Sequence, residues 1–335
     1  MLSNYSLRPH NTFGIDARCR QFVEFSTVEE CVSFLRTSCL KDEPLLLIGS
    51  GSNLLLTGDY KGTVIHSAIH GMQATIDGNY VYVRAGSGMQ WDDLADRCCS
   101  NGWYGTENLA LIPGEVGAAA VQNIGAYGAE VSQLVSEIEV VDVHDGSRSV
   151  IPADRCNYGY RDSRFKHEWK GRYLITHVTL RLTRTFKPLL DYGNIRTELQ
   201  RKGIEKPTAR QLRDAIVEIR RNKLPDPKVT GNAGSFFMNP VVKREKMEAL
   251  LADNPLMPHY HVDETHEKIP AGWLIEQCGW KGKALGSAAV YERQALVLVN
   301  RGGATGADIV ALCRAIQRDV ETRFGIKLQP EVNIV

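Results

Sequence analysis

The chain has 335 residues, of which 43% are hydrophobic and 24% charged, and its 40 basic and 39 acidic side chains leave a formal charge of +1. This length exceeds the usual size of one domain, and the composition is that of a globular protein with no biased tract. The balanced charge gives no electrostatic reason to expect nucleic acid or an anionic membrane as a partner.

The apolar stretches and the cysteines indicate which broad class of protein this is. The longest apolar stretches, such as LLLI at 45–48, are far too short to cross a bilayer, so we expect no membrane insertion. The N-terminal stretch MLSNYSLRPHNTFG lacks the apolar core of a secretory signal. The eight cysteines are scattered and form no C-x-x-C or Cys/His cluster, so we expect no metal site and reduced thiols in a cytoplasmic protein.

The first predicted elements alternate between helix and strand. A helix is predicted over about residues 27–39, with Ser26 and Glu29 as its capping box. LLLI at 45–48 is a buried strand, and the glycine loop GSGSN follows it. YVYVRAG at 80–86 alternates as a half-buried strand does, and WDDLADRCCSNG is typical of a short helix closed by Gly102.

The later elements continue this mixture. EIEVVDV and RSVI flank Asp145-Gly146, which predicts a hairpin, and YLITHVTLRL at 173–182 is a further strand. A helix opens near Thr208 and stops before Pro225, and the Pro-Asp-Pro at 225–227 is the best domain boundary in the chain. A long helix over about 305–324 and the extended tail KLQPEVNIV complete a mixed α/β or α+β pattern.

Two glycine-rich stretches are candidates for ligand binding. Gly49 and Gly51 can present backbone N–H groups to a phosphate, but the third glycine and helix of a dinucleotide-binding loop are missing, so a plain tight turn is the alternative. In IPGEVGAAAVQNIGAYGAE (112–130), small residues would let the backbone approach a flat ligand. Composition alone favours the alternative there, a buried helix packed against a sheet.

GNAGSFFMNP at 231–240 places Ser235 between a glycine and two phenylalanines. Phe237 stands where the nucleophile pattern G-x-S-x-G needs its second glycine, so that pattern is absent. The phenylalanines indicate an apolar setting, in which the hydroxyl either satisfies a backbone group or meets a ligand. Arg161 in YGYRDSRFK, the basic run RRNKLPDPK and Glu331 in QPEV are, taken singly, typical of solvated or helix-end charges.

Together, five motifs occur in a characteristic order: GSGSNLL, IPGEVGAAAVQNIGAYG, YGYRDSRFK, RRNKLPDPKVTGNAGSFFMNP and QPEV. In that order they resemble the UDP-N-acetylenolpyruvoylglucosamine reductase family, flavoenzymes of peptidoglycan precursor synthesis. The resemblance runs from NTFGI at 11–15 to the last residues. LLDYGNI at 189–195 is similar to a segment of the longer subtype of the family, in which Tyr192 has the position of a substrate-covering tyrosine.

The resemblance implies an α+β fold with a flavin-binding part of the vanillyl-alcohol-oxidase type and a C-terminal α+β substrate-binding domain. Residues 1–69 with 323–335 would form the first FAD-binding subdomain, 70–224 the second, and 225–322 the substrate-binding domain. The implied reaction passes hydride from NADPH to FAD and then to UDP-N-acetyl-3-O-(1-carboxyvinyl)glucosamine, which gives UDP-N-acetylmuramate. An FAD-dependent oxidase or dehydrogenase of the same fold acting on another small molecule is the alternative, and a non-catalytic binding protein is a more distant one.

The resemblance also assigns roles by position. Ser235 matches the proton donor to the substrate carbon, and Arg161 and Glu331 match the pair that stabilises the enolate beside the substrate carboxylate. The residues that match contacts of the FAD pyrophosphate are Gly49, Ser50, Gly51, Ser52 and Asn53. Those that match other FAD contacts are Ile112, Pro113, Gly114, Gly117, Asn123, Gly125, Ala126, Tyr127 and Arg220. The positions that match UDP-sugar contacts are Tyr192, Lys223, Asn239 and Gln294.

We expect FAD to be bound non-covalently, because the chain has no evident counterpart of a histidyl or cysteinyl flavin link. NADPH is the expected reductant, although no motif separates it from NADH. Asn333 stands where family members often have a flavin-contacting arginine, so one FAD contact has no counterpart here. A monomer is the default expectation.

Overall fold

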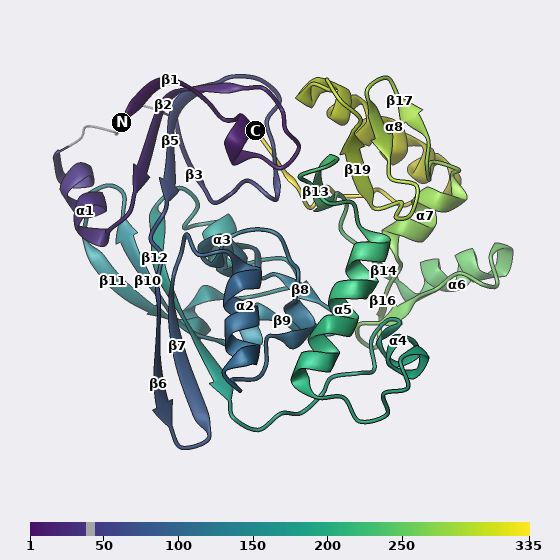
Figure 1. Ribbon diagram of the computed structural model, residues 1–335. Coiled ribbons are helices and arrows are strands. Elements are labelled where there is room, and N and C mark those ends of the chain that lie inside the picture. The colour runs from purple at the N-terminus through teal and green to yellow at the C-terminus, as the bar shows by residue number, and fades with distance from the viewer. Residues whose placement is uncertain (38–43) are drawn as a thin grey trace. The chain divides into compact units, whose positions relative to one another are not determined.

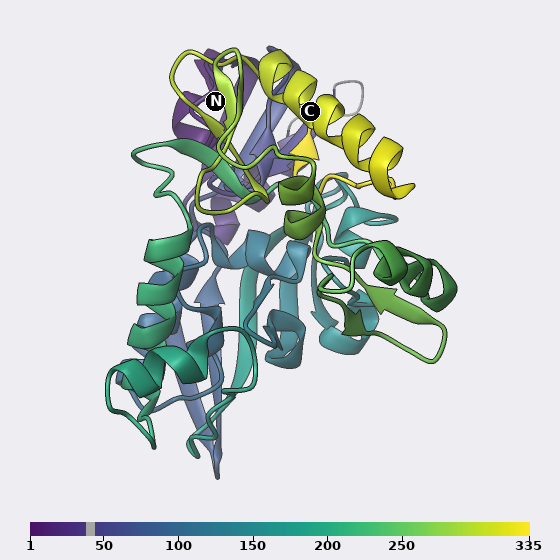
Figure 2. The same cartoon turned by 90° about the vertical axis from the view of Figure 1, so that its right-hand side faces the viewer.

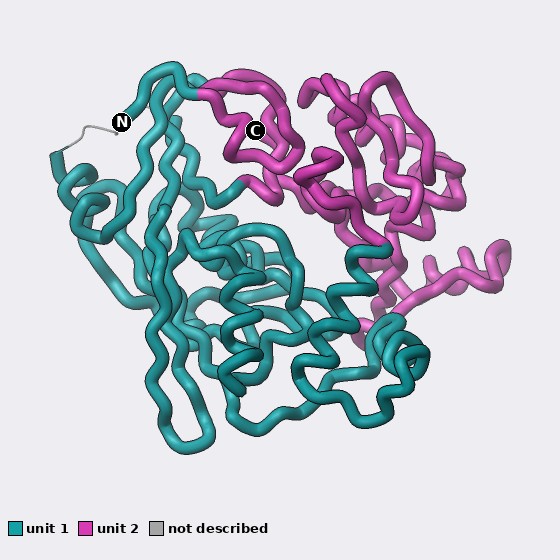
Figure 3. The backbone as a smooth tube through the Cα atoms, viewed as in Figure 1, with its two compact units in different colours: residues 1–5, 19–50, 61–222 teal, residues 6–18, 51–60, 223–335 magenta. Residues whose placement is uncertain are grey.

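The computed structural model describes residues 1–37 and 44–335, which form two compact units (Figure 3). Unit 1 comprises residues 1–5, 19–50 and 61–222, without the undescribed 38–43, and unit 2 comprises residues 6–18, 51–60 and 223–335. The three-part division expected from the sequence stays a prediction.

Unit 1 is built on a five-stranded antiparallel sheet with the strand order β11-β10-β12-β7-β6 (Figure 1). Its strands are β6 (Met72–Asp77), β7 (Tyr80–Gly86), β10 (Val135–Asp142), β11 (Arg148–Pro152) and β12 (Tyr173–Thr183). Alternate residues of β7, namely Val81, Val83 and Ala85, are buried, as the period of two predicts. They belong to a core that α2 (Trp91–Ser100) and α3 (Val116–Gln122) complete on the same face of the sheet.

A four-stranded sheet with the order β1-β2-β5-β3 also belongs mainly to unit 1. Its strands are β1 (Leu2–Ser6), β2 (Arg18–Phe25), β3 (Leu45–Ile48) and β5 (Tyr60–Ser67). Helix α1 (Val28–Thr37) packs Cys31, Val32 and Leu35 into one core with residues of β2 and β5. The apolar stripe of this helix is therefore what attaches it to the sheet.

The remaining helices of unit 1 are α4 (Ile195–Arg201) and α5 (Ala209–Lys223), which share a core through Leu199, Leu212 and Ile216 (green in Figure 2). A short hairpin of β8 (Gly125–Ala126) and β9 (Ala129–Glu130) follows α3. Single 3-10 turns of unit 1 lie at Glu107–Leu109, Val131–Gln133, Ala153–Cys156 and Arg164–Lys166, and one in unit 2 lies at Arg8–His10.

Unit 2 contains an antiparallel sheet with the order β13-β19-β18-β17. Its strands are β13 (Gly231–Ser235), β17 (Ala284–Leu285), β18 (Ala288–Val290) and β19 (Val297–Asn300). The long helix α8 (Gly306–Phe324) contacts β18, β19 and α7 (Ala271–Gln277). Thr305 caps α8 through a reciprocal bond with Asp308, and left-handed Gly325 ends it.

Two smaller sheets complete unit 2. β14 (Val241–Lys243), β15 (Tyr260–His261) and β16 (His266–Lys268) form an antiparallel sheet beside α6 (Arg244–Asp253). β4 (Leu54–Leu55) pairs in parallel with β20 (Asn333–Ile334), so the end of the tail that was expected to be extended is a strand. The pairing joins the end of the glycine loop to the last residues of the chain.

Most predicted elements are confirmed, but the capping box of α1 lies one residue later than expected. Thr27, rather than Ser26, accepts the N–H of Glu30 at 3.2 Å, and the Glu30 carboxylate accepts the N–H groups of Thr27 and Ser26 at 3.2 and 2.9 Å. The helix is described as far as Thr37, and the predicted residues 38 and 39 lie outside the described residues.

The sequence analysis also made predictions about the cysteines and about membrane insertion. The seven described cysteines are free, and Cys39 lies outside the described residues. Within residues 1–37 and 44–335 no helix is long and apolar enough to cross a bilayer, and no group of three or more His, Cys, Asp or Glu residues could hold a metal ion.

Candidate functional site

The glycine loop after β3 depends on two close backbone approaches. In unit 1, a Cβ at Gly49 would lie 3.0 Å from the Glu115 Oε2 atom and 3.1 Å from the Ala118 Cβ atom. In unit 2, Gly51 has φ +69°, and a Cβ there would lie 2.0 Å from the His10 carbonyl oxygen. Any larger residue at position 51 would clash with this carbonyl, so the tight path of the backbone requires glycine there.

The end of this loop is tied to the C-terminal tail within unit 2. The Asn53 side-chain amide donates to the Glu331 carbonyl at 3.3 Å, and the Asn53 carbonyl accepts the N–H of Asn333 at 3.1 Å. The Asn333 side chain donates to the same carbonyl at 3.1 Å. Asn333 therefore holds the loop through both its backbone and its side-chain N–H groups.

A buried acid–base pair that the sequence analysis did not single out lies beside Gly49 in unit 1. His66 is 7% exposed, and its two ring nitrogens lie 2.8 Å from Glu24 Oε2 and 3.0 Å from Glu115 Oε2. Burial lowers the pKa of His66, but the hydrogen bonds and charges of Glu115 and then Glu24 outweigh it, so the pKa is raised overall. A protonated His66 would balance a carboxylate that adjoins the predicted phosphate loop.

The run at 112–130 contains α3, so it does include the buried helix that its composition favoured. A Cβ at Gly117 would lie 2.8 Å from the Ser87 Cβ atom, so glycine lets α3 approach the preceding strand-to-helix connection. Before α3, Ile112 is half-buried, Pro113 is exposed and Gly114 is left-handed with φ +119°. Gly114 therefore gives the end of this stretch a left-handed backbone, which residues with a side chain rarely adopt.

Asn123 ends α3 in the left-handed conformation and is fully buried. Its side chain donates to the Gly159 carbonyl at 2.7 Å and to Glu130 Oε2 at 3.1 Å, and it accepts the N–H of Ser132 at 3.1 Å. These bonds show how Asn123 shapes the turn into the β8–β9 hairpin. A contact with FAD stays a prediction.

Arg161 lies against the same turn. Its guanidinium donates to the carbonyl of Gly125 and, at 3.4 Å, to that of Asn123, and its Cζ atom lies 5.2 Å from the centre of the Tyr160 ring. A Cβ at Gly125 would lie 2.6 Å from Arg161 Nη1, so glycine at the start of β8 makes room for the arginine. The structure therefore brings a predicted catalytic residue next to predicted flavin-contacting residues.

Arg220 and Tyr127 form a second, half-buried group in unit 1. Arg220 Nε donates to the Leu111 carbonyl at 3.3 Å, and burial lowers the pKa of this arginine. Burial also raises the pKa of Tyr127, which the neighbouring Arg220 opposes. Tyr192 adjoins this group, because a Cβ at Gly128 would lie 3.5 Å from the Tyr192 Cβ atom. Ala126 belongs to the same hairpin, in β8.

In unit 2, backbone pairing brings the segments of Ser235 and Glu331 together. The carbonyl of Phe236, the residue after Ser235, accepts the N–H of Glu331 at 2.8 Å, and Phe237 bridges to Pro330. Ser235 ends β13 just after a register irregularity and is half-buried, while Phe236 is 0% exposed. Phe236 and Phe237 are both buried, while the apolar setting expected for the Ser235 hydroxyl stays a prediction.

The predicted UDP-sugar residues of unit 2 lie near the first turn of α7. The side-chain oxygen of Asn239 accepts the N–H of Ala271 at 2.9 Å. The Gln294 Oε1 atom accepts the N–H of Leu296 at 3.2 Å and would lie 3.1 Å from a Cβ at Gly272. Both side chains use their carbonyl oxygen in this way, so the NH₂ group is the one that can donate to a ligand. Lys223 is the last residue of α5.

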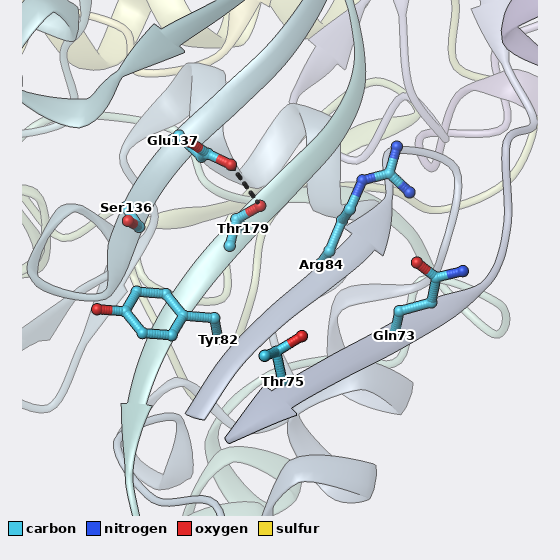
Figure 4. A pocket seen from close by; sticks show the side chains of 7 residues that line it. All are labelled: Gln73, Thr75, Tyr82, Arg84, Ser136, Glu137 and Thr179. Carbon is cyan, nitrogen blue, oxygen red and sulfur yellow. Dashed lines mark hydrogen bonds between the residues drawn. The ribbon is translucent and has the colours of Figure 1, made fainter. Parts of the chain in front are cut away.

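A hollow of about 310 Å³ lies on the face of the five-stranded sheet (Figure 4). Side chains from β6, β7, β10 and β12 line it, among them Arg84, which donates to Glu139 at 2.7 Å, and Thr179, which donates to Glu137 at 3.5 Å. Its lining contains none of the residues that the sequence analysis assigned to FAD or substrate. We therefore do not place the candidate site there.

Two protein-family models match parts of this chain. The FAD binding domain matches residues 19–150, and the C-terminal domain of UDP-N-acetylenolpyruvoylglucosamine reductase matches residues 226–335. A UDP-N-acetylenolpyruvoylglucosamine reductase of Bacteroides fragilis strain YCH46 is 50% identical over 100% of both chains. The chain belongs to this family. A reductase of the same name from Burkholderia multivorans is 47% identical over 99% of this chain and 96% of that one.

A solved structure supports the fold. The UDP-N-acetylenolpyruvylglucosamine reductase of Thermus caldophilus has a TM-score of 0.66 to this chain at 23% identity, and the match covers 98% of this chain and 97% of that one. Together with the FAD-binding match, it confirms the expected α+β fold with a flavin-binding part, a C-terminal domain of the reductase family and FAD as the cofactor.

The residues present fit a flavin nucleotide. Two arginines of unit 1, Arg161 and Arg220, lie against the segment 111–127. In the same segment, the buried side-chain nitrogen of Gln122 has no hydrogen-bond partner among the described residues. Such a donor set suits the phosphate and carbonyl oxygens of FAD.

Proposed function

We propose that this chain catalyses the NADPH-dependent reduction of UDP-N-acetyl-3-O-(1-carboxyvinyl)glucosamine to UDP-N-acetylmuramate in the cytoplasm, as a monomer. Full-length identity of 50% to a UDP-N-acetylenolpyruvoylglucosamine reductase is the observation that carries this proposal. The bound FAD would supply the hydride that adds to the enolpyruvyl double bond. The protein's own residues have to bind the substrate, stabilise the charge that develops and deliver a proton.

Hydride addition leaves negative charge on the substrate carbon next to the carboxylate, as an enolate. Stabilisation of an enolate requires positive charge or hydrogen-bond donors directed at the carboxylate. Arg161 supplies a cation, and Glu331 would act as a neutral acid, because an ionised carboxylate would repel the enolate. Arg161 is held by the carbonyls of Gly125 and Asn123, so it is oriented before the substrate arrives.

The enolate must then take a proton on carbon, and Ser235 is the proposed donor. The pairing of Phe236 with Glu331 is the geometric support for this proposal, since it fixes the Ser235 strand and the Glu331 segment side by side in unit 2. The buried phenylalanines after Ser235 would limit water near the hydroxyl.

The remaining predicted contacts complete the proposal. The 49–53 loop would hold the FAD pyrophosphate, and the segment 112–127 with Arg220 would line other parts of the cofactor. In the manner of the longer subtype, Tyr192 would cover the UDP-sugar, and Lys223 would bind its diphosphate through charge. Asn239 and Gln294 would donate to the UDP-sugar through their side-chain NH₂ groups.

Stopped-flow spectroscopy of Ser235→Ala tests the donor role. We expect flavin reduction by NADPH to stay near the wild-type rate, and reoxidation by the enolpyruvyl UDP-sugar to slow by about 10²- to 10⁴-fold, the typical worth of a general acid. Ser287→Ala, which removes a hydroxyl between β17 and β18 of the same sheet, is the matched control and should leave both rates unchanged. An equal loss in both half-reactions would contradict the donor role.

The wild-type protein tests the substrate class. After anaerobic bleaching by NADPH, the flavin absorbance should return when the enolpyruvyl UDP-sugar is added. If it returned only with air, the chain would be an oxidase of the same fold acting on another small molecule.

A further inference from the structure

Leu111, just before the predicted flavin-lining residues, has an unusual backbone conformation. Its φ is +56°, in the left-handed region that residues other than glycine rarely adopt. Gly114 is left-handed as well, with φ +119°, so Ile112 and Pro113 lie between two residues of unusual conformation. Strained residues of this kind persist only where the surroundings hold them, and they cluster at functional sites.

Charged side chains hold both polar groups of Leu111. Its N–H donates to Asp92 Oδ1 at 2.5 Å, and its carbonyl accepts from Arg220 Nε at 3.3 Å. Asp92 lies in the first turn of α2 and Arg220 lies on α5. A hydrogen bond to a charged group is about twice as strong as one between neutral groups, so these two contacts can compensate the strain at Leu111.

Trp91, the neighbour of Asp92, holds the two ends of the same segment. Its indole N–H donates to the Leu109 carbonyl at 2.9 Å, and its backbone N–H donates to the Gly114 carbonyl at 2.9 Å. The first turn of α2 therefore determines the path of the chain from Leu109 to Gly114, with the bond from Asp92 at its centre.

The carboxylate of Asp92 is itself held by a buried cation. Arg213 Nη2 lies 2.9 Å from Asp92 Oδ1, and Arg213 is 7% exposed. Arg213 also lies 3.4 Å from Asp96, one turn further along α2, which in turn lies 2.6 Å from Arg210. Asp96 thus shares the ion-pair network of Asp92, whereas the carboxylate that accepts the Leu111 N–H is that of Asp92.

We propose that Asp92, oriented by Arg213, is a positioning residue of the flavin site: it keeps Leu111 left-handed and so directs the backbone of 112–114 toward FAD. The inference rests on the proposed placement of FAD along 112–114. It adds Asp92 of α2 and Arg213 of α5 to the flavin site, although the proposed function gives neither residue a contact with FAD. Deletion of the Asp92 carboxylate should release Leu111 to an ordinary conformation and misplace the segment.

The affinity of the apoprotein for FAD, measured by quenching of flavin fluorescence, tests this. Asp92→Ala should bind FAD about 5- to 30-fold more weakly, the factor that corresponds to the strain of one left-handed residue with a side chain. Asp96→Ala is the matched control, because it breaks the same ion-pair network without removing the bond to Leu111, and it should bind FAD as the wild type does. The melting temperature of each variant reports folding separately.

A second substitution distinguishes positioning from general support of the fold. Glycine adopts φ near +56° without strain, so Asp92→Ala combined with Leu111→Gly should regain most of the lost affinity. Equal losses in Asp92→Ala and Asp96→Ala, or no recovery in the double variant, would overturn the inference. If Asp92→Ala bound FAD normally while Ser235→Ala behaved as proposed, the inference alone would fail. A wild-type protein that bound no FAD would contradict both.

Discussion

Leu111, Asn123, Tyr127 and Arg161 carry side chains in the left-handed conformation that glycine normally takes. They are four of the six such non-glycine residues among those that the structure describes, and all four lie in or beside the segments assigned to FAD and the enolate. Each left-handed conformation costs conformational free energy, and the contacts of the residue must compensate this cost. Leu111, Asn123 and Arg161 form hydrogen bonds of this kind: to Asp92, to Glu130, and to the carbonyl of Gly125.

The buried His66 makes a prediction about pH at this scale. Its pKa in the folded protein is raised by Glu115 and Glu24, so its stabilising effect is fully present below the pKa of an unfolded histidine, about 6.5, and is lost as the pH rises through the folded value. We expect the free energy of unfolding, measured in urea between pH 6 and 9, to fall with pH in the wild type more steeply than in His66→Gln.

The exposed His144 provides the control for this measurement, since His144→Gln should retain the wild-type pH profile. Parallel profiles of His66→Gln and the wild type would show that His66 does not titrate in this way.

Among the elements, α1 shows where a local pattern leaves the register undecided. The sequence contains Ser26-x-x-Glu29 and Thr27-x-x-Glu30, and each satisfies the capping-box pattern. The structure uses the second, in which the helix begins at Val28 and buries Cys31, Val32 and Leu35. Packing of this stripe against β2 and β5 accompanies the chosen register, and a short sequence window does not contain that information.

The cap of α1 can be tested by paired substitutions. Thr27→Ala should lower the free energy of unfolding by about 1 kcal/mol, because the N–H of Glu30 loses its acceptor. Ser26→Ala should be nearly neutral, since Ser26 contributes its backbone N–H to Glu30. Chemical denaturation of both variants measures the difference, and a larger loss in Ser26→Ala would support the earlier register instead.

At the scale of the whole molecule, burial protects most of the described thiols. Six of the seven described cysteines are buried, and Cys278 is partly exposed. Burial raises the pKa of Cys31, Cys98 and Cys313 to about 12, so little of the reactive thiolate exists near pH 8.

Alkylation of the native protein with iodoacetamide at pH 8, followed by peptide mapping, should therefore modify Cys278 first among these seven. Cys31, Cys98 and Cys313 should react at a comparable rate only after unfolding in urea. Peptide mapping reports Cys39, which lies outside the described residues, separately. Fast native labelling of Cys313 would contradict the burial of α8.

The sequence by itself determined the local elements and the family. Alternation is a property of neighbouring residues, so YVYVRAG is recognisable as the strand β7, and five motifs in order are enough to indicate the reductase family. It also singled out Ser235, because a hydroxyl beside two phenylalanines is locally unusual. The roles assigned to the individual site residues remain predictions.

Only the tertiary structure decided which of these residues meet. Phe236 and Glu331 are 95 positions apart, and Arg220 and Leu111 are 109 apart, yet each pair shares a hydrogen bond. In the sequence, Asp92 is an ordinary acidic residue in the first turn of a helix, where the helix dipole alone explains the presence of an acidic side chain. Its bond to Leu111 exists because α2, α5 and the segment before α3 pack together, and packing of distant segments leaves no local sequence pattern.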